Sequence, residues 1–168
     1  MKNHNKEQAL VQLIIENKEN FYRLAFSYVK NKDDALDIVQ ESIHKALLSL
    51  GNLKEEQKLK SWFYRIVVNK SLDFLRKHRR VNVMDDTTLE LYSNGNHDVY
   101  QDIDLERCLD DLPEKFRTVI VLRYFEDLKI EEIAEILKEN QNTIKTRLYR
   151  ALSMLRIQME QTKLLKER

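Results

Sequence analysis

The sequence of 168 residues is poor in residues that bend or cross-link a chain: two glycines, one proline and one cysteine. So few glycines and prolines argue against a turn-rich β fold and favour long helices. The lone cysteine, Cys108, excludes an internal disulfide and agrees with a reducing compartment. No apolar run approaches the ~18 residues that a transmembrane helix needs. The N-terminal residues also lack an apolar signal core, so we expect a cytoplasmic protein.

Net charge is close to zero, at +1, but the charges are unevenly distributed. Residues 60–80 hold seven Lys or Arg against one Asp, a net +6, and residues 138–168 hold eight against three Glu, a net +5. Between these segments, residues 81–114 hold ten Asp or Glu against one Arg, a net −9. The overall charge therefore says nothing for or against a nucleic-acid partner, whereas the two basic segments make one a candidate.

Three helices are predicted in the first 80 residues. The first spans about residues 10–29, and the second, which Asp33 or Asp34 can cap, has the most regular 3.6-residue apolar repeat of the chain. The third spans about residues 61–77, and its predicted apolar face consists of Trp62, Phe63, Ile66 and Val67. Because three amphipathic helices can bury one core, we predict a helical domain at residues 5–80.

A helix-turn-helix is predicted in the C-terminal part of the chain. Its first apolar stripe consists of Ile130, Ile133, Ala134 and Leu137. Its second stripe, after a short break, consists of Ile144, Leu148, Ala151, Leu152 and Leu155. Two short helices joined so tightly must cross steeply to share one core. We predict an all-α protein of two small helical domains, the second at residues 105–163, joined by a flexible acidic linker at residues 81–104.

The second helix of this motif has a polar face opposite its apolar stripe. Asn142 or Asn140 can cap its N-terminus, which is also able to hold a phosphate. The exposed face carries Lys145, Thr146, Arg147, Tyr149 and Arg150. Cations, a hydroxyl and an aromatic ring on one helix face are groups that can contact the major groove of DNA.

Three motifs occur in order along the chain: Asp34–Ser42, then Ser61–Asn69 followed by Asp73–Arg80, then Leu112–Leu155. Together they resemble the extracytoplasmic-function group of sigma-70 factors, and within it the sigma-V subgroup. The first resembles the signature of region 2, the second the promoter-melting and −10 segment, and the third region 4. The resemblance implies a transcription initiation factor that brings core RNA polymerase to stress-response promoters and helps to open the DNA. It implies neither enzymatic activity nor a cofactor.

The resemblance also assigns residues to partners. Docking on the clamp helices of the largest polymerase subunit is expected from Asp37, Gln40 and Glu41. Contact with the −10 DNA, including a base-binding pocket at Asn69, is expected from Arg65, Asn69, Lys70, Arg76, Lys77, Arg79 and Arg80. Contact with the −35 DNA is expected from Asn142, Thr143, Lys145, Thr146, Arg147, Tyr149 and Arg150. Further implied partners are the polymerase β flap and an anti-sigma factor, often membrane-anchored.

Alternatives exist for several of these assignments. The polar face near Glu41 can be a plain solvated helix surface, Asn69 can be an ordinary surface residue, and the chain can be a stand-alone helix-turn-helix regulator. Members of the family usually have glycine in the turn, where this chain has Lys138. A left-handed Lys138 carries a Cβ penalty, unless Asn140 takes that conformation instead. The four histidines and Cys108 lack the spacing of metal ligands, so no metal site is expected.

Overall fold

Helices make up all the regular structure of residues 2–84 and 102–167, the part of the chain that the computed structural model describes. The expected all-α class is therefore confirmed. The chain divides into two compact units, residues 1–92 and 93–168. Nowhere in the described residues is a helix both long and apolar enough to cross a membrane.

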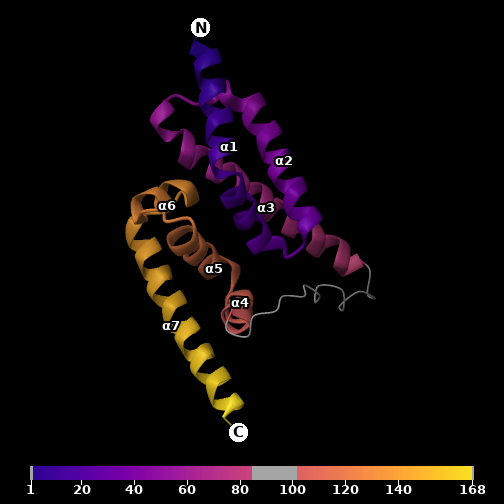
Figure 1. Cartoon of the computed structure of the whole chain (residues 1–168), viewed down its shortest axis with the longest axis vertical. Coiled ribbons are helices and arrows are strands. Elements are labelled where there is room, and N and C mark those ends of the chain that lie inside the picture. Colours follow the sequence, from indigo (N-terminus) through magenta and orange to yellow (C-terminus); the bar gives the residue numbers. More distant parts are fainter. Residues whose placement is uncertain (1, 85–101, 168) are drawn as a thin grey trace. The chain divides into compact units, whose positions relative to one another are not determined.

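The first unit is a bundle of three long helices that pack against one another (Figure 1). Its elements are α1 (Lys2–Val29), α2 (Lys32–Ser49), the 3-10 turns η1 (Leu50–Asn52) and η2 (Glu56–Lys58), and α3 (Leu59–Met84). Helix α3 is longer than the expected 61–77 and includes the first four residues of the expected linker. Residues 85–101 of that linker lie outside the described part of the chain.

An aromatic cluster fills the core of the first unit. The ring of Phe21 from α1 lies 4.6 Å from that of Phe63 and 4.9 Å from that of Tyr64, both in edge-on orientation. Such pairs stabilise a core by about 0.5–1.5 kcal/mol beyond their buried area. The expected apolar face of α3 was therefore partly wrong, because the helix turns Tyr64 inward and leaves Trp62 and Ile66 half-exposed.

The sequence suggested Asp33 or Asp34 as the cap of α2, but the N-terminus of this helix is capped by Asn31. The Asn31 side-chain oxygen accepts hydrogen bonds from the backbone N–H groups of Asp33 at 2.9 Å and Asp34 at 3.1 Å. Asn31 has the extended conformation that a cap requires, whereas the two aspartates already lie in the first helical turn. There their carboxylates still interact favourably with the positive end of the helix dipole.

The second unit is built along one long helix. Its elements are α4 (Asp102–Asp111), α5 (Glu114–Ile120), the π-helical turn η3 (Val121–Phe125), α6 (Ile130–Leu137) and α7 (Gln141–Lys166). Helices α4, α5 and α6 all pack on α7 (Figure 1). The predicted helix-turn-helix is confirmed as α6, a short turn and α7. Two details differ from expectation: α4 is a separate helix, and α7 continues well beyond Leu155.

The buried stripe of α7 is narrower than the sequence predicted. Ile144, Ala151 and Leu155 are buried, as expected, but Leu152 is 39% exposed. Leu152 lies about 100° further round the helix than Ala151, which already points into the core. The side chain therefore falls at the edge of the contact between α7 and the rest of the unit.

Candidate nucleic-acid interface

The turn between α6 and α7 depends on one left-handed residue. Lys138 has φ 54° and ψ 43°, and its backbone N–H donates to the carbonyl of Ala134. Asn140 is extended, with φ −77° and ψ 157°, so it does not take the left-handed conformation. Of the two alternatives for this turn, the chain adopts the one with a Cβ penalty of about 1–2 kcal/mol at Lys138.

Asn140 is the cap of α7. Its side-chain oxygen accepts a hydrogen bond of 2.8 Å from the backbone N–H of Thr143. Asn142 lies inside the first turn, where its carbonyl accepts a 2.9 Å bond from the Thr146 hydroxyl. A capped helix start with further backbone N–H groups and the positive dipole end is suited to a phosphate.

Five of the seven residues expected to contact −35 DNA lie exposed on the first three turns of α7: Asn142, Lys145, Thr146, Tyr149 and Arg150. Tyr149 is 77% exposed, although tyrosine side chains are usually at least partly buried. The other two residues, Thr143 and Arg147, are half-buried on the flank of the helix. Nη2 of Arg147 lies 2.7 Å from Oε1 of Glu139 in the turn.

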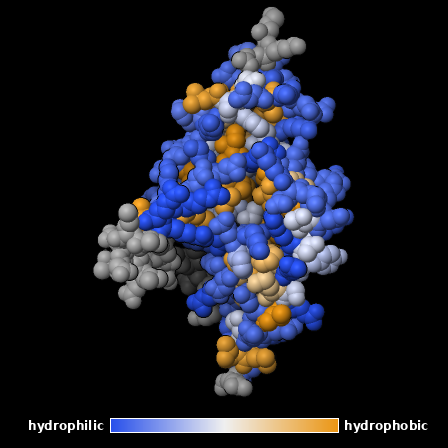
Figure 2. Space-filling model, turned by 180° about the vertical axis from the view of Figure 1, so that it is seen from behind, coloured by the Kyte–Doolittle hydropathy of each residue, from blue (hydrophilic) through white to orange (hydrophobic). Residues whose placement is uncertain are grey.

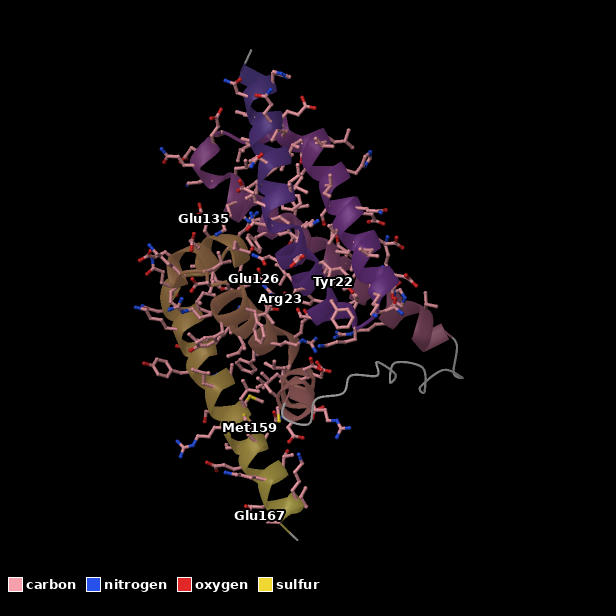
Figure 3. All side chains as sticks on the ribbon, in the orientation of Figure 1. Tyr22, Arg23, Glu126, Glu135, Met159 and Glu167 are labelled. Carbon is pink, nitrogen blue, oxygen red and sulfur yellow. The ribbon has the colours of Figure 1, made fainter. Side chains whose placement is uncertain are left out.

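Beyond this face, α7 continues with a mixture of polar and apolar exposed residues. Met159 marks the middle of this second half and Glu167 follows its last turn (Figure 3). Leu164 and Leu165 are 65% and 75% exposed, and hydrophobic residues are visible near this end of the chain in the surface view (Figure 2). The residues expected to contact −35 DNA therefore all lie in the N-terminal half of α7, while the second half carries further cations, Arg156, Lys163 and Lys166, beside these apolar side chains.

Residues expected at −10 DNA lie on α3 in two groups. Arg65, Asn69, Arg76 and Arg80 follow one another at intervals of four, seven and four residues, which places them on one side of the helix. Asn69, Arg76 and Arg80 are exposed and Arg65 is half-buried, while Nη1 of Arg76 lies 3.2 Å from Oδ1 of Asp73.

The other three expected −10 residues lie beside this line. Lys77 and Arg79 are exposed on its flanks. Lys70 turns towards α2, and its Nζ lies 3.3 Å from Oε2 of Glu41. The structure therefore gathers four of the seven predicted residues on one face and directs Lys70 away from it.

The residues expected to dock on polymerase lie on the outer side of α2. Asp37, Gln40 and Glu41 are exposed, while Ala35 and Ile38 on the inner side are buried. Glu41 and Lys70 border an open cavity of about 380 Å³, which is lined by Gln40, Glu41, His44, Lys45, Leu48 and Lys70. The sequence pattern did not single out His44, Lys45 and Leu48, which line this cavity with Glu41 from the exposed side of α2.

Comparison with known proteins identifies both units. Residues 13–81 match the family described as Sigma-70 region 2, and residues 102–155 match Sigma-70, region 4. The RNA polymerase sigma factor SigV of Bacillus subtilis is 59% identical over 89% of this chain and 90% of its own length. The ECF RNA polymerase sigma factor SigW of the same organism is 30% identical over 91% of this chain and 90% of its own.

A solved structure agrees with these matches. The sigma factor RpoE of Bartonella quintana, crystallised with the anti-sigma factor NepR, superposes with a TM-score of 0.76. The two chains are 25% identical, and the match covers 92% of this chain and 96% of the other.

The chain therefore belongs to the extracytoplasmic-function group of the sigma-70 family. It is an RNA polymerase sigma factor that directs transcription initiation, and such a subunit is not itself an enzyme. This membership sets aside the alternative of a stand-alone helix-turn-helix regulator.

Proposed function

We propose that this sigma factor recognises promoters through two separate DNA-binding faces, one on α7 for the −35 element and one on α3 for the −10 element. The observation that carries this proposal is the exposed face of α7, where Lys145, Thr146 and Arg150 lie side by side beyond a capped N-terminus. Arginine can bind a guanine edge with two hydrogen bonds, and lysine neutralises phosphate as a point charge. Tyr149 adds an aromatic surface that is able to contact a thymine methyl group or the sugar backbone.

At the −10 element, Asn69 is proposed to bind a base turned out of the non-template strand. Its exposed amide offers both a donor and an acceptor to a base edge. Extruding a base costs a few kcal/mol, so the surrounding surface must supply compensating contacts. Arg65, Arg76 and Arg80 on the same side of α3 are suited to hold the neighbouring phosphates.

Polymerase binding is proposed at two places. The exposed polar groups of Asp37, Gln40 and Glu41 on α2 are suited to the clamp helices of the largest subunit. A small polar patch of this kind contributes specificity more than affinity. The second unit is proposed to bind the β flap, and this contact would place α7 upstream of the first unit on the promoter.

Regulation by an anti-sigma factor is also proposed. The relative from Bartonella quintana was crystallised in complex with the anti-sigma factor NepR. By analogy, we propose that a partner of this kind, membrane-anchored, holds the present protein inactive on the cytoplasmic side. Release of the factor would then switch on a set of stress-response promoters.

Reconstituted transcription tests the central proposal. Core RNA polymerase freed of sigma factors is combined with the full chain and with genomic DNA fragments, and transcript starts are mapped. We expect starts that share two upstream sequence elements, and we expect promoter affinity to fall steeply with salt as phosphate contacts release counterions. Starts that share only one element would contradict recognition by two faces.

A further inference from the structure

Arg147 differs from the other cations at the start of α7. Its side chain is 25% exposed and its Nη2 lies 2.7 Å from Oε1 of Glu139, whose side chain is 37% exposed. Lys145 and Arg150, by contrast, are exposed, and within residues 102–167 neither forms an ion pair. Three cations that look equivalent in the sequence therefore have different surroundings.

The backbone of Glu139 is held in place within the turn. Its backbone N–H donates a 3.0 Å hydrogen bond to the carbonyl of Ala134 in α6. It lies between the left-handed Lys138 and the capping residue Asn140, both of which have defined conformations. The Arg147–Glu139 pair therefore links the second turn of α7 to the end of α6 across eight residues of sequence.

Electrostatics favours retention of this pair when DNA binds. A charge-assisted hydrogen bond between partly buried groups is stronger than one between fully exposed groups. If Arg147 left Glu139 to contact a phosphate, it would leave an unpaired carboxylate beside the DNA-facing helix. Like charges brought together at an interface weaken binding.

We propose that Arg147 is a positioning residue, which holds α7 at a fixed angle to α6 through Glu139, and not a DNA contact. The inference rests on the proposed −35 recognition by α7 and narrows it to the exposed residues of that helix. A helix held in its bound orientation loses less freedom on binding and so binds more tightly. Base contacts need this precision, because hydrogen bonds weaken steeply when their angles change.

The direction in which Glu139→Gln changes DNA affinity distinguishes the two possible roles of Arg147. The probe is a DNA duplex that wild-type holoenzyme selects from a random-sequence library, with binding followed by fluorescence anisotropy. For a positioning pair, we expect Glu139→Gln to weaken binding about five- to tenfold, although it removes a negative charge near the DNA. If Arg147 contacts phosphate instead, Glu139→Gln frees the arginine and strengthens binding, which would overturn the proposal.

Three further variants complete the test. Arg147→Gln should weaken binding about as much as Glu139→Gln, and the double variant should be no weaker than either single one, because both remove the same interaction. The exchanged pair Glu139→Arg with Arg147→Glu should recover affinity to within about twofold, because it re-forms the link with opposite polarity. A glutamate at a true phosphate contact could not be rescued in this way.

The salt dependence of DNA affinity provides an independent test, because a change in protein stability alone would not alter it. Arg147→Gln should keep the wild-type slope of log affinity against log salt, whereas loss of one phosphate contact would lower that slope by about 0.9. Circular dichroism and thermal melting establish that each variant is folded. Failure of wild-type holoenzyme to select any duplex would refute −35 recognition itself, and this inference with it. A normal wild type with additive single variants would refute only the role of Arg147.

Discussion

The two helices proposed to contact DNA, α3 and α7, each hold some of their cations in ion pairs, but at different positions; on α7, Arg147 is paired with Glu139. On α3, Arg76 is paired with Asp73 at 3.2 Å and Lys70 with Glu41 at 3.3 Å. On α7, Lys145 and Arg150 have no ion-pair partner within the described part of the second unit. A cation that is paired with a carboxylate presents less net positive charge to a phosphate than an unpaired one does. We therefore expect the second unit to supply most of the affinity for duplex DNA and the first unit to act mainly once the strands separate.

The largest expected effect tests whether the two units are independent. Phe21→Ala removes the ring that packs on Phe63 and Tyr64, and it should lower the free energy of unfolding of the first unit by about 3–5 kcal/mol. Urea unfolding can be followed by the fluorescence of Trp62, the only tryptophan of the chain. Binding of −35 duplex should persist, and Val11→Ala, at an exposed position of α1, serves as control. Parallel loss of duplex binding would show that the units unfold together.

Charge reversal on α7 should have the next largest effect. Arg150→Glu removes the proposed base or phosphate contact and adds repulsion, so we expect about a 100-fold loss of −35 duplex binding, measured by anisotropy. Binding to core polymerase in a pull-down should remain. The matched control is Lys163→Glu, on the same helix about 20 Å away along its axis. An equal loss for both variants would point to a general charge effect.

The complementary change on α3 should separate binding from DNA opening. Asn69→Ala removes the amide donor and acceptor that we propose for the extruded base, and we expect about tenfold slower opening with little change in duplex affinity. Permanganate reactivity of unpaired thymines measures the opened state. Arg150→Glu serves as the comparison, because it should weaken duplex binding, the step that precedes opening. Weaker duplex binding with normal opening would contradict the pocket role of Asn69.

The smallest effect concerns backbone conformation. Lys138→Gly relieves the left-handed Cβ penalty, and part of the gain is offset by the greater freedom of glycine in the unfolded chain. We expect a net stabilisation of the second unit by about 1 kcal/mol in thermal unfolding. Lys30→Gly, at φ 56° in the first unit, should gain less, because the Lys30 ammonium also lies 5.8 Å from the centre of the Phe26 ring. Destabilisation by Lys138→Gly would mean that its side chain contributes to the turn.

Periodic apolar spacing was enough to predict α2 and the helix-turn-helix, because each has one buried face. For α3 the spacing predicted the helix and the burial of Phe63 and Val67, but not which side is buried throughout, because aromatic and β-branched residues occur on more than one side of the helix. There the contact of Tyr64 with Phe21 on another helix decides which side is buried. Helix α4 could have been found, because Leu105, Cys108, Leu109 and Leu112 follow the same spacing.

Family resemblance predicted candidate site residues, but it did not predict how they pair with other charges. Lys70 and Glu41 are separated by 29 residues, and only the packing of α3 on α2 brings them together. Arg147 and Glu139 are close in sequence, but their contact depends on the left-handed Lys138 and the angle at which α7 leaves the turn. The role of a charged residue therefore depends on tertiary neighbours that a linear motif does not contain.

Helix α7 runs without interruption from Gln141 to Lys166, a length of about 39 Å. A continuous helix is stiff, so the N-terminal end that is proposed to contact the −35 element cannot rotate unless the end that packs on α4 moves with it. Binding of a partner at the C-terminal end of α7 would therefore change the orientation of its N-terminal half relative to the promoter.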